Sequence, residues 1–153
     1  MCWVKAVGSK TAPELYAAHL SQREAAQILS NFFYDVRLKS RIELRAADSM
    51  PPRYIAAYAQ LVKSVFGSPA ALQNVLRHYA GITTLDITTA KLAVCKDGFN
   101  ALAYGKPISS EMTWLLMQAR SRTPSQEERA LLDPFMALVM KRKTIRETEN
   151  YNE

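Results

Sequence analysis

Residues 67–95 read GSPAALQNVLRHYAGITTLDITTAKLAVC, and this segment carries the clearest signals of secondary structure in the chain. Gly67-Ser68-Pro69 predicts that one helix ends and another begins, because glycine ends helices, serine caps them and proline fits their first turn. The apolar side chains that follow recur at helical spacing: Leu72, Val75, Leu76 and Tyr79. Gly81 interrupts this pattern, and helical spacing resumes from Leu85 to Cys95. We therefore expect two helices joined by a tight turn at Gly81.

A longer helix is expected just before this stretch. Pro51 and Pro52 end the preceding segment, since proline cannot continue a helix. From Arg53 to Phe66 the apolar side chains follow one face of a helix, and Gly67 is the expected left-handed stop. The region at about 53–95 then forms a three-helix unit with the pattern of a helix-turn-helix, in which a first helix braces a second against the DNA major groove.

The remaining chain is also predicted to be helical. We expect a short helix at 11–22, a helix that begins with the capping box Ser21 and Glu24 and continues as far as Leu44, and a helix capped by Ser109 or Ser110. A last helix at 125–139 must be kinked or divided by Pro134. After Cys95, Asp97-Gly98 either caps the preceding helix, which we favour, or turns a short hairpin near 93–102.

These elements define the expected architecture. The prediction is an all-α fold, with one compact helical domain over 1–140 and a basic, then polar, flexible tail over 141–153. The 153 residues are 48% hydrophobic, which is enough to bury a core.

Charge and cysteine content restrict the class of function. Twenty Lys and Arg against 14 Asp and Glu give a net charge of +6, and the pI is about 9.4, which favours polyanionic partners. The two cysteines, Cys2 and Cys95, stand apart without histidines at ligand spacing, so we expect no metal site and no cofactor. No apolar run predicts a membrane span or a secretory signal, and a cytoplasmic location is expected.

The second helix of the predicted motif carries the candidate DNA-binding residues. Ile87, Ala90 and Val94 are expected to face inward. The opposite side then offers hydroxyls, methyl groups and one ammonium to base edges. The candidate base-reading residues are Thr83, Thr84, Thr88, Thr89 and Lys91. The candidate phosphate contacts are Arg77, His78, Lys96 and Lys106.

A single unit of this kind touches few base pairs, so a homodimer or a complex with another regulator subunit is expected on double-stranded DNA. The helix at 125–139 is the candidate contact through Leu131, Phe135 and Leu138, and it could equally pack internally.

The segment from Leu76 to Ile87 resembles the helix-turn-helix of bacterial transcriptional regulators, including those of plasmids and phages. More loosely, it is similar to FlhC-like flagellar master regulators and their mobile-element relatives. The resemblance covers under about a fifth of the chain and implies the general role of a DNA-binding regulator. The four-cysteine zinc site typical of the flagellar regulator is absent from this sequence.

Other functions are less well supported by the sequence. His19 and His78 are the two histidines, and no phosphate-binding glycine loop or nucleophile motif occurs, so no catalytic residue and no enzymatic activity are predicted. The alternative function is a helical protein-interaction module, such as an adaptor, chaperone or inhibitor, that binds through Phe135, Met136, Met140 and the Trp114 region.

Overall fold

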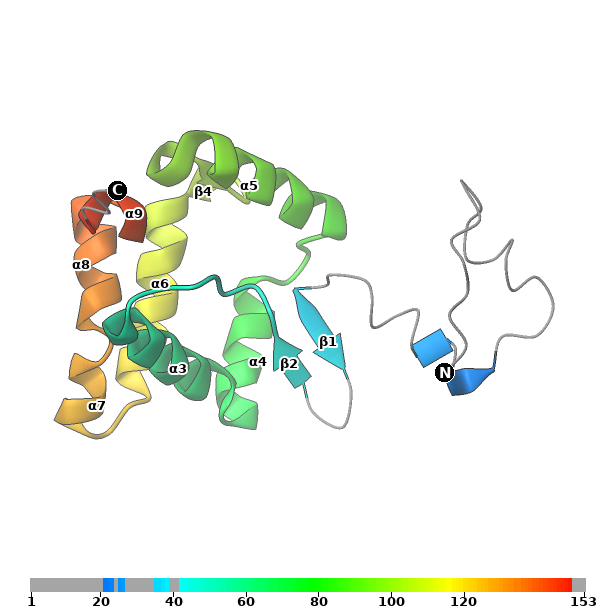
Figure 1. Cartoon of the computed structure of the whole chain (residues 1–153), viewed down its shortest axis with the longest axis horizontal. Coiled ribbons are helices and arrows are strands. Elements are labelled where there is room, and N and C mark those ends of the chain that lie inside the picture. Colours follow the sequence, from blue (N-terminus) through cyan, green and yellow to red (C-terminus); the bar gives the residue numbers. More distant parts are fainter. Residues whose placement is uncertain (1–20, 24, 27–34, 39–41, 150–153) are drawn as a thin grey trace. The chain divides into compact units, whose positions relative to one another are not determined.

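The computed structural model describes residues 21–23, 25–26, 35–38 and 42–149, and Figure 1 draws the whole chain. It divides the chain into two units, Met1–Ser49 and Met50–Glu153, where the sequence predicts one domain over 1–140. The described part is mainly helical, and its strands form two short two-stranded ribbons. The all-α prediction is therefore confirmed.

The first unit contains an antiparallel ribbon of β1 (Val36–Leu38) and β2 (Ile42–Leu44), paired with Val36 opposite Leu44. The prediction of a helix continuing as far as Leu44 is wrong. Arg37 and Glu43 lie opposite each other and form an ion pair of 2.7 Å, a cross-strand pairing that a helix does not offer. The predicted helix at 11–22 and the segment 27–34 lie outside the described residues, apart from the last two positions of the former.

Three helices build the core of the second unit: α3 (Pro52–Phe66), α6 (Ile108–Ser121) and α8 (Asp133–Lys141). Figure 1 shows α3 beside α6 and α8. The fully or nearly fully buried side chains between them are Val65, Leu116, Ala119, Leu132 and Val139. Burying a valine or leucine side chain stabilises a fold by roughly 1.5–3 kcal/mol, so this cluster anchors the unit.

A buried polar contact fixes α3 against the end of α6. Thr123, only 2% exposed, donates to the carbonyl of Ala119 and lies 2.9 Å from the hydroxyl of Ser64. The amide of Gln60 donates to the same threonine oxygen over 3.2 Å. Each buried polar group thus has a partner, which burial requires.

The three predicted helices at 53–95 are present as α3, α4 (Pro69–His78) and α5 (Thr84–Asp97). The expected three-helix unit is wrong, because α3 packs with α4 whereas the main contacts of α5 are with later residues of the chain. Ser68 caps α4 as predicted. Gly81 has a φ of +86°, as the predicted turn requires. The left-handed stop expected at Gly67 is wrong, since its φ is −73°. Gly67 is needed for space instead, because a Cβ there would lie 2.2 Å from the carbonyl oxygen of Lys63.

Gly98 caps α5, as favoured, and the hairpin lies later in the chain than 93–102. A short 3₁₀ helix, η1 (Gly98–Asn100), leads into β3 (Leu102–Ala103) and β4 (Lys106–Pro107). Tyr104 and Gly105 form the turn between these strands with φ values of +55° and +77°. The main contacts of α5 are with β3 and η1, so this ribbon supports α5.

The C-terminal part departs from the prediction at the start of α6 and agrees with it at Pro134. The helix α6 begins at Ile108, directly after Pro107, and not at a serine cap. Pro134 divides the 125–139 segment into α7 (Gln126–Ala130), which Ser125 caps, and α8.

The structure describes the segment predicted to be a flexible tail as far as Glu149. Thr144 and Glu147 form a capping box that starts α9 (Ile145–Thr148), and Glu149 accepts from Arg53 and from the Tyr54 hydroxyl. These contacts hold the segment against α3.

Candidate functional site

The exposed side of α5 carries the predicted base-reading residues. Thr83, Thr84, Thr88, Thr89 and Lys91 are all exposed. Thr83 is the N-cap: its oxygen accepts from the backbone N–H of Asp86, whose carboxylate accepts in turn from the backbone N–H of Thr83 over 2.8 Å. The Thr83 hydrogen bonds lower the pKa of Asp86. Thr83 therefore fixes the start of α5.

Thr88 also bonds within the helix. Its hydroxyl donates to the carbonyl of Thr84 over 3.0 Å. The oxygen can still accept a hydrogen bond, and the methyl group stays on the exposed side.

Sequence reasoning missed that α5 also exposes two leucines. Leu85 is 73% exposed and Leu92 is 67% exposed. They are seven residues apart, a spacing that places both on one side of a helix. This spacing in the sequence is the signal that could have predicted that both leucines lie on the same side of α5. The exposed surface of α5 is thus a mixture of threonine, lysine and leucine.

The predicted phosphate contacts separate into two groups. Arg77 and Lys96 are exposed, at the last turns of α4 and α5 respectively, and Arg77 donates to the side chain of Asn74 over 2.7 Å. His78 and Lys106 instead contact Glu111, with separations of 2.9 Å and 3.3 Å. The His78 side chain is 18% exposed, whereas that of Lys106 is 57% exposed, so Lys106 stays accessible beside its contact with Glu111.

Glu111 is the centre of a polar cluster on α6. Its side chain is only 7% exposed, and it lies within reach of His78 from α4 and Lys106 from β4. Burial raises the pKa of this carboxyl, but the hydrogen bonds and charges of His78 and Lys106 outweigh burial, so the pKa is below its ordinary value. Burial and the neighbouring Glu111 raise the pKa of Tyr79 well above its ordinary value.

Aromatic rings surround this cluster. The imidazole of His78 stacks on Trp114 with centroids 3.5 Å apart and planes at 10°. Tyr79 makes edge contacts with both rings and with Tyr104, whose centroid lies 5.7 Å away. The sequence gives no signal for this arrangement, because His78, Tyr104 and Glu111 are far apart along the chain and meet only through tertiary packing.

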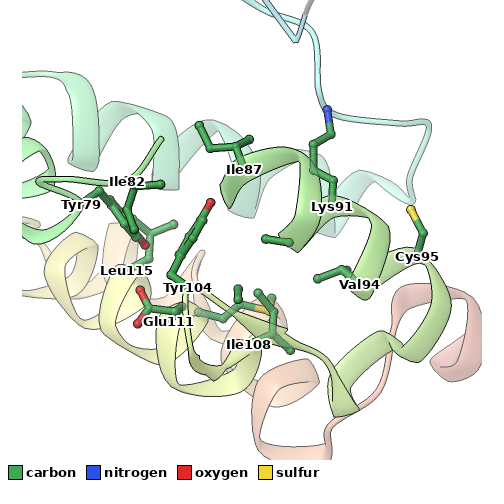
Figure 2. A pocket seen from close by; sticks show the side chains of 13 residues that line it. Tyr79, Ile82, Ile87, Lys91, Val94, Cys95, Tyr104, Ile108, Glu111 and Leu115 are labelled. Atoms are coloured by element: carbon green, nitrogen blue, oxygen red, sulfur yellow. The ribbon is translucent and has the colours of Figure 1, made fainter. Parts of the chain in front are cut away.

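A cavity of about 630 Å³ lies beneath α5, next to this cluster (Figure 2). Ile87, Ala90 and Val94 of α5, which are predicted to face inward, form one wall. Of these, only Ala90 is buried, since Ile87 is 42% exposed and Val94 is 37% exposed, so this wall is open to solvent. Tyr79, Tyr104 and Glu111 lie at the other side, and the lining is otherwise mostly apolar. Thus α5 has an exposed side and a side that covers an apolar space.

The candidate oligomer contacts are placed unevenly. Leu138 is only 6% exposed, and Phe135 packs against the core cluster, so both are used inside the unit. Leu131 is 41% exposed and Met140 is 80% exposed. Of the three predicted contacts, Leu131 is the one at the surface.

Other kinds of site receive no support from the described residues. Among them, no three His, Cys, Asp or Glu side chains come together as metal ligands. Cys95 is exposed and carries a free thiol. No helix within the described ranges has the length and apolar character needed to cross a membrane. No family model, curated protein or solved structure matches the chain.

Proposed function

We propose that this protein is a sequence-specific DNA-binding transcriptional regulator and that α5 is its recognition helix. The observation that carries the proposal is the exposure of all five candidate base-reading residues on and beside a helix that follows a left-handed glycine turn. A helix of this kind fits the major groove, which is about 12 Å wide. The resemblance of residues 76–87 to regulators of plasmids and phages agrees with this role.

The chemistry of α5 suits base reading. A threonine offers a hydroxyl to base edges and a methyl group to thymine, and Lys91 supplies a donor for guanine or phosphate. Arg77, Lys96 and Lys106 are the exposed candidate phosphate contacts, whereas His78 is mostly buried beside Glu111. The net charge of +6 favours encounter with DNA.

The proposal includes a second subunit and a cytoplasmic location. Regulators of this type read two half-sites about 34 Å apart, which requires a homodimer or a different regulator subunit. Leu131 and Met140 are the exposed apolar side chains available on and beside α8 for this contact. An exposed free thiol at Cys95 is consistent with a reducing compartment.

The test selects duplexes from a random library and measures their affinity by fluorescence anisotropy. The variant combines Thr88→Ala and Lys91→Ala. Its control combines Thr113→Ala and Lys141→Ala and removes the same charge. The Thr113 hydroxyl donates to the backbone carbonyl of Ser109 on α6, as the Thr88 hydroxyl does to that of Thr84 on α5. We expect the variant to lose about tenfold or more in affinity at one salt concentration, and the control to bind as the parent protein does.

Affinity should also fall steeply with salt, because phosphate contacts release counterions. Failure to enrich any duplex would contradict the proposal. An equal loss of affinity in variant and control would remove Thr88 and Lys91 from the reading role.

A second function is favoured by the exposed leucines of α5. An apolar stripe of Leu85 and Leu92 on a surface helix is typical of a protein-interaction helix, and this would make the chain an adaptor or inhibitor. Nuclease-treated native lysate, passed over the immobilised protein, should then yield one stoichiometric partner. Leu85→Ser with Leu92→Ser would abolish that capture, whereas the Thr88 and Lys91 double variant would retain it.

A further inference from the structure

The cavity beneath α5 has the size and the walls of a small-molecule site. Its volume of about 630 Å³ falls within the range of roughly 300–1,000 Å³ that is usual for ligand pockets. Its lining combines apolar side chains of α5 and α6 with two tyrosines, the buried carboxylate of Glu111, and Lys91 and Cys95 of α5. Such a combination of apolar walls and few polar groups is the ordinary composition of a ligand site.

The position of Tyr104 is an independent indication of function. Its φ is +55°, in the left-handed region, where residues with a large side chain are uncommon and strained. The ring lines the cavity with its centroid 5.7 Å from that of Tyr79, and Figure 2 shows its hydroxyl directed toward the α5 side. Asparagine or glycine would form this turn with less strain.

The charges at the polar side of the cavity define the ligand. Glu111 is the carboxylate that faces the cavity, and it contacts Lys106 over 3.3 Å and His78 over 2.9 Å, so its charge is balanced within the unit. Lys91 also lines the cavity, and Figure 2 shows its ammonium group directed away from Glu111. A cationic ligand would compete with Lys106 for the carboxylate. An anionic ligand would face the carboxylate and lose its hydration among apolar walls. An uncharged molecule meets neither penalty.

We propose that the cavity between α5 and α6 binds an uncharged aromatic small molecule whose one polar group meets the Tyr104 hydroxyl or Glu111. The proposal goes beyond DNA binding and does not depend on it. Ring faces of Tyr79 and Tyr104 suit an aromatic ligand, because offset and edge contacts between rings are favourable.

The test uses N-phenyl-1-naphthylamine, an uncharged fluorescent probe with one N–H donor, on the full chain. Its matched anion is 1-anilino-8-naphthalenesulfonate, which has the same skeleton with a sulfonate added. We expect the neutral probe to bind saturably with one site per chain, and the anion to bind about tenfold or more weakly. A second pair of compounds tests the effect of positive charge. The uncharged 1-naphthylmethanol should displace the neutral probe more effectively than the cation 1-naphthylmethylammonium does.

Variants locate the site. Ile87→Trp fills the cavity from α5 and should weaken binding of the neutral probe by about tenfold or more. Its control, Leu92→Trp, adds the same side chain on the exposed side of α5 and should bind as the parent protein does. Because the Ile87 variant could unfold, Tyr104→Phe provides a second variant that keeps the ring, and loss of one neutral hydrogen bond predicts a weakening of about three- to tenfold.

Several results would overturn the proposal. These are unsaturable binding of the neutral probe, equal or tighter binding of either charged probe, or an equal effect of Trp at positions 87 and 92. Retention of full affinity in Tyr104→Phe together with a folded, fully binding Ile87→Trp would place the probe elsewhere. Absence of DNA binding, in contrast, would contradict only the regulator proposal, because the fluorescence of the bound probe is measured without DNA.

Discussion

The imidazole Nε2 of His78 lies 2.9 Å from the Oε2 of Glu111, and this contact joins the end of α4 to the start of α6. Lys106 reaches the other carboxylate oxygen from the ribbon that supports α5. One buried carboxylate therefore holds together three elements on either side of the turn at Gly81.

Replacing Glu111 should destabilise the fold. Glu111→Gln keeps the shape but removes the charge that His78 and Lys106 contact, and the loss of a buried hydrogen-bonded charge predicts a decrease of about 1–3 kcal/mol in the free energy of unfolding. Urea unfolding followed by circular dichroism measures the change. Glu127→Gln, in the exposed first turn of α7, is the control and should change stability little. Equal stability of both variants would show that the cluster does not support the fold.

The lowered pKa of Glu111 also predicts a dependence of stability on pH. Because the pKa is lower in the folded protein than in the unfolded chain, the unfolded chain takes up the proton first. Ionised Glu111 therefore makes its full contribution to the free energy of unfolding when the pH is above the pKa of the unfolded chain, about 4.3. This contribution is lost as the pH falls through the pKa of the folded protein.

Asp86 and Glu147 have lowered pKa values for the same kind of reason and act in the same direction. Urea midpoints of the parent protein should fall as pH decreases from about 5.5 to 3.5, and those of Glu111→Gln should fall less. A parallel decline in both proteins would mean that other carboxylates carry the effect.

The capping box of α5 supplies a third prediction. Thr83→Ala removes the oxygen that accepts from the backbone of Asp86 and should cost about 1 kcal/mol of helix stability, whereas Thr83→Ser should retain it. Since α5 has only one fully buried residue, Ala90, the loss should be local. Amide exchange should quicken throughout α5 but not in α6. Uniform quickening across both helices would contradict the local role.

Local signals predicted the helices well. The boundaries of α4 and α5 follow from Ser68, Gly81 and the Thr83 cap, all of which act within a few residues of their own position. The helix expected as far as Leu44 is wrong because the apolar spacing of this segment also fits two paired strands. The pairing of Arg37 with Glu43 across these strands involves residues six positions apart, which helical spacing does not bring together.

The candidate site was only half visible in the sequence. The threonines of α5 were found because one helix carries them all. The cluster of His78, Tyr104 and Glu111 was not found, because residues 26 and 33 positions beyond His78 meet it only through packing of α6 and the β3–β4 ribbon. The spacing of residues along a chain does not predict tertiary contacts of this kind.

Two glycines of the predicted motif should respond differently to substitution. Gly81→Ala should destabilise by about 1–2 kcal/mol through backbone strain alone, since φ is +86° and a Cβ there meets nothing within 4 Å. Gly67→Ala should destabilise through a collision, because the Cβ would lie 2.2 Å from the Lys63 carbonyl. Asparagine separates the two causes, since it tolerates a left-handed backbone but still has a Cβ. Gly81→Asn should therefore be more stable than Gly81→Ala in urea unfolding, and Gly67→Asn should be no better than Gly67→Ala. If asparagine is more stable than alanine at both positions, or at neither, then backbone strain at Gly81 and steric collision at Gly67 are not the two separate causes.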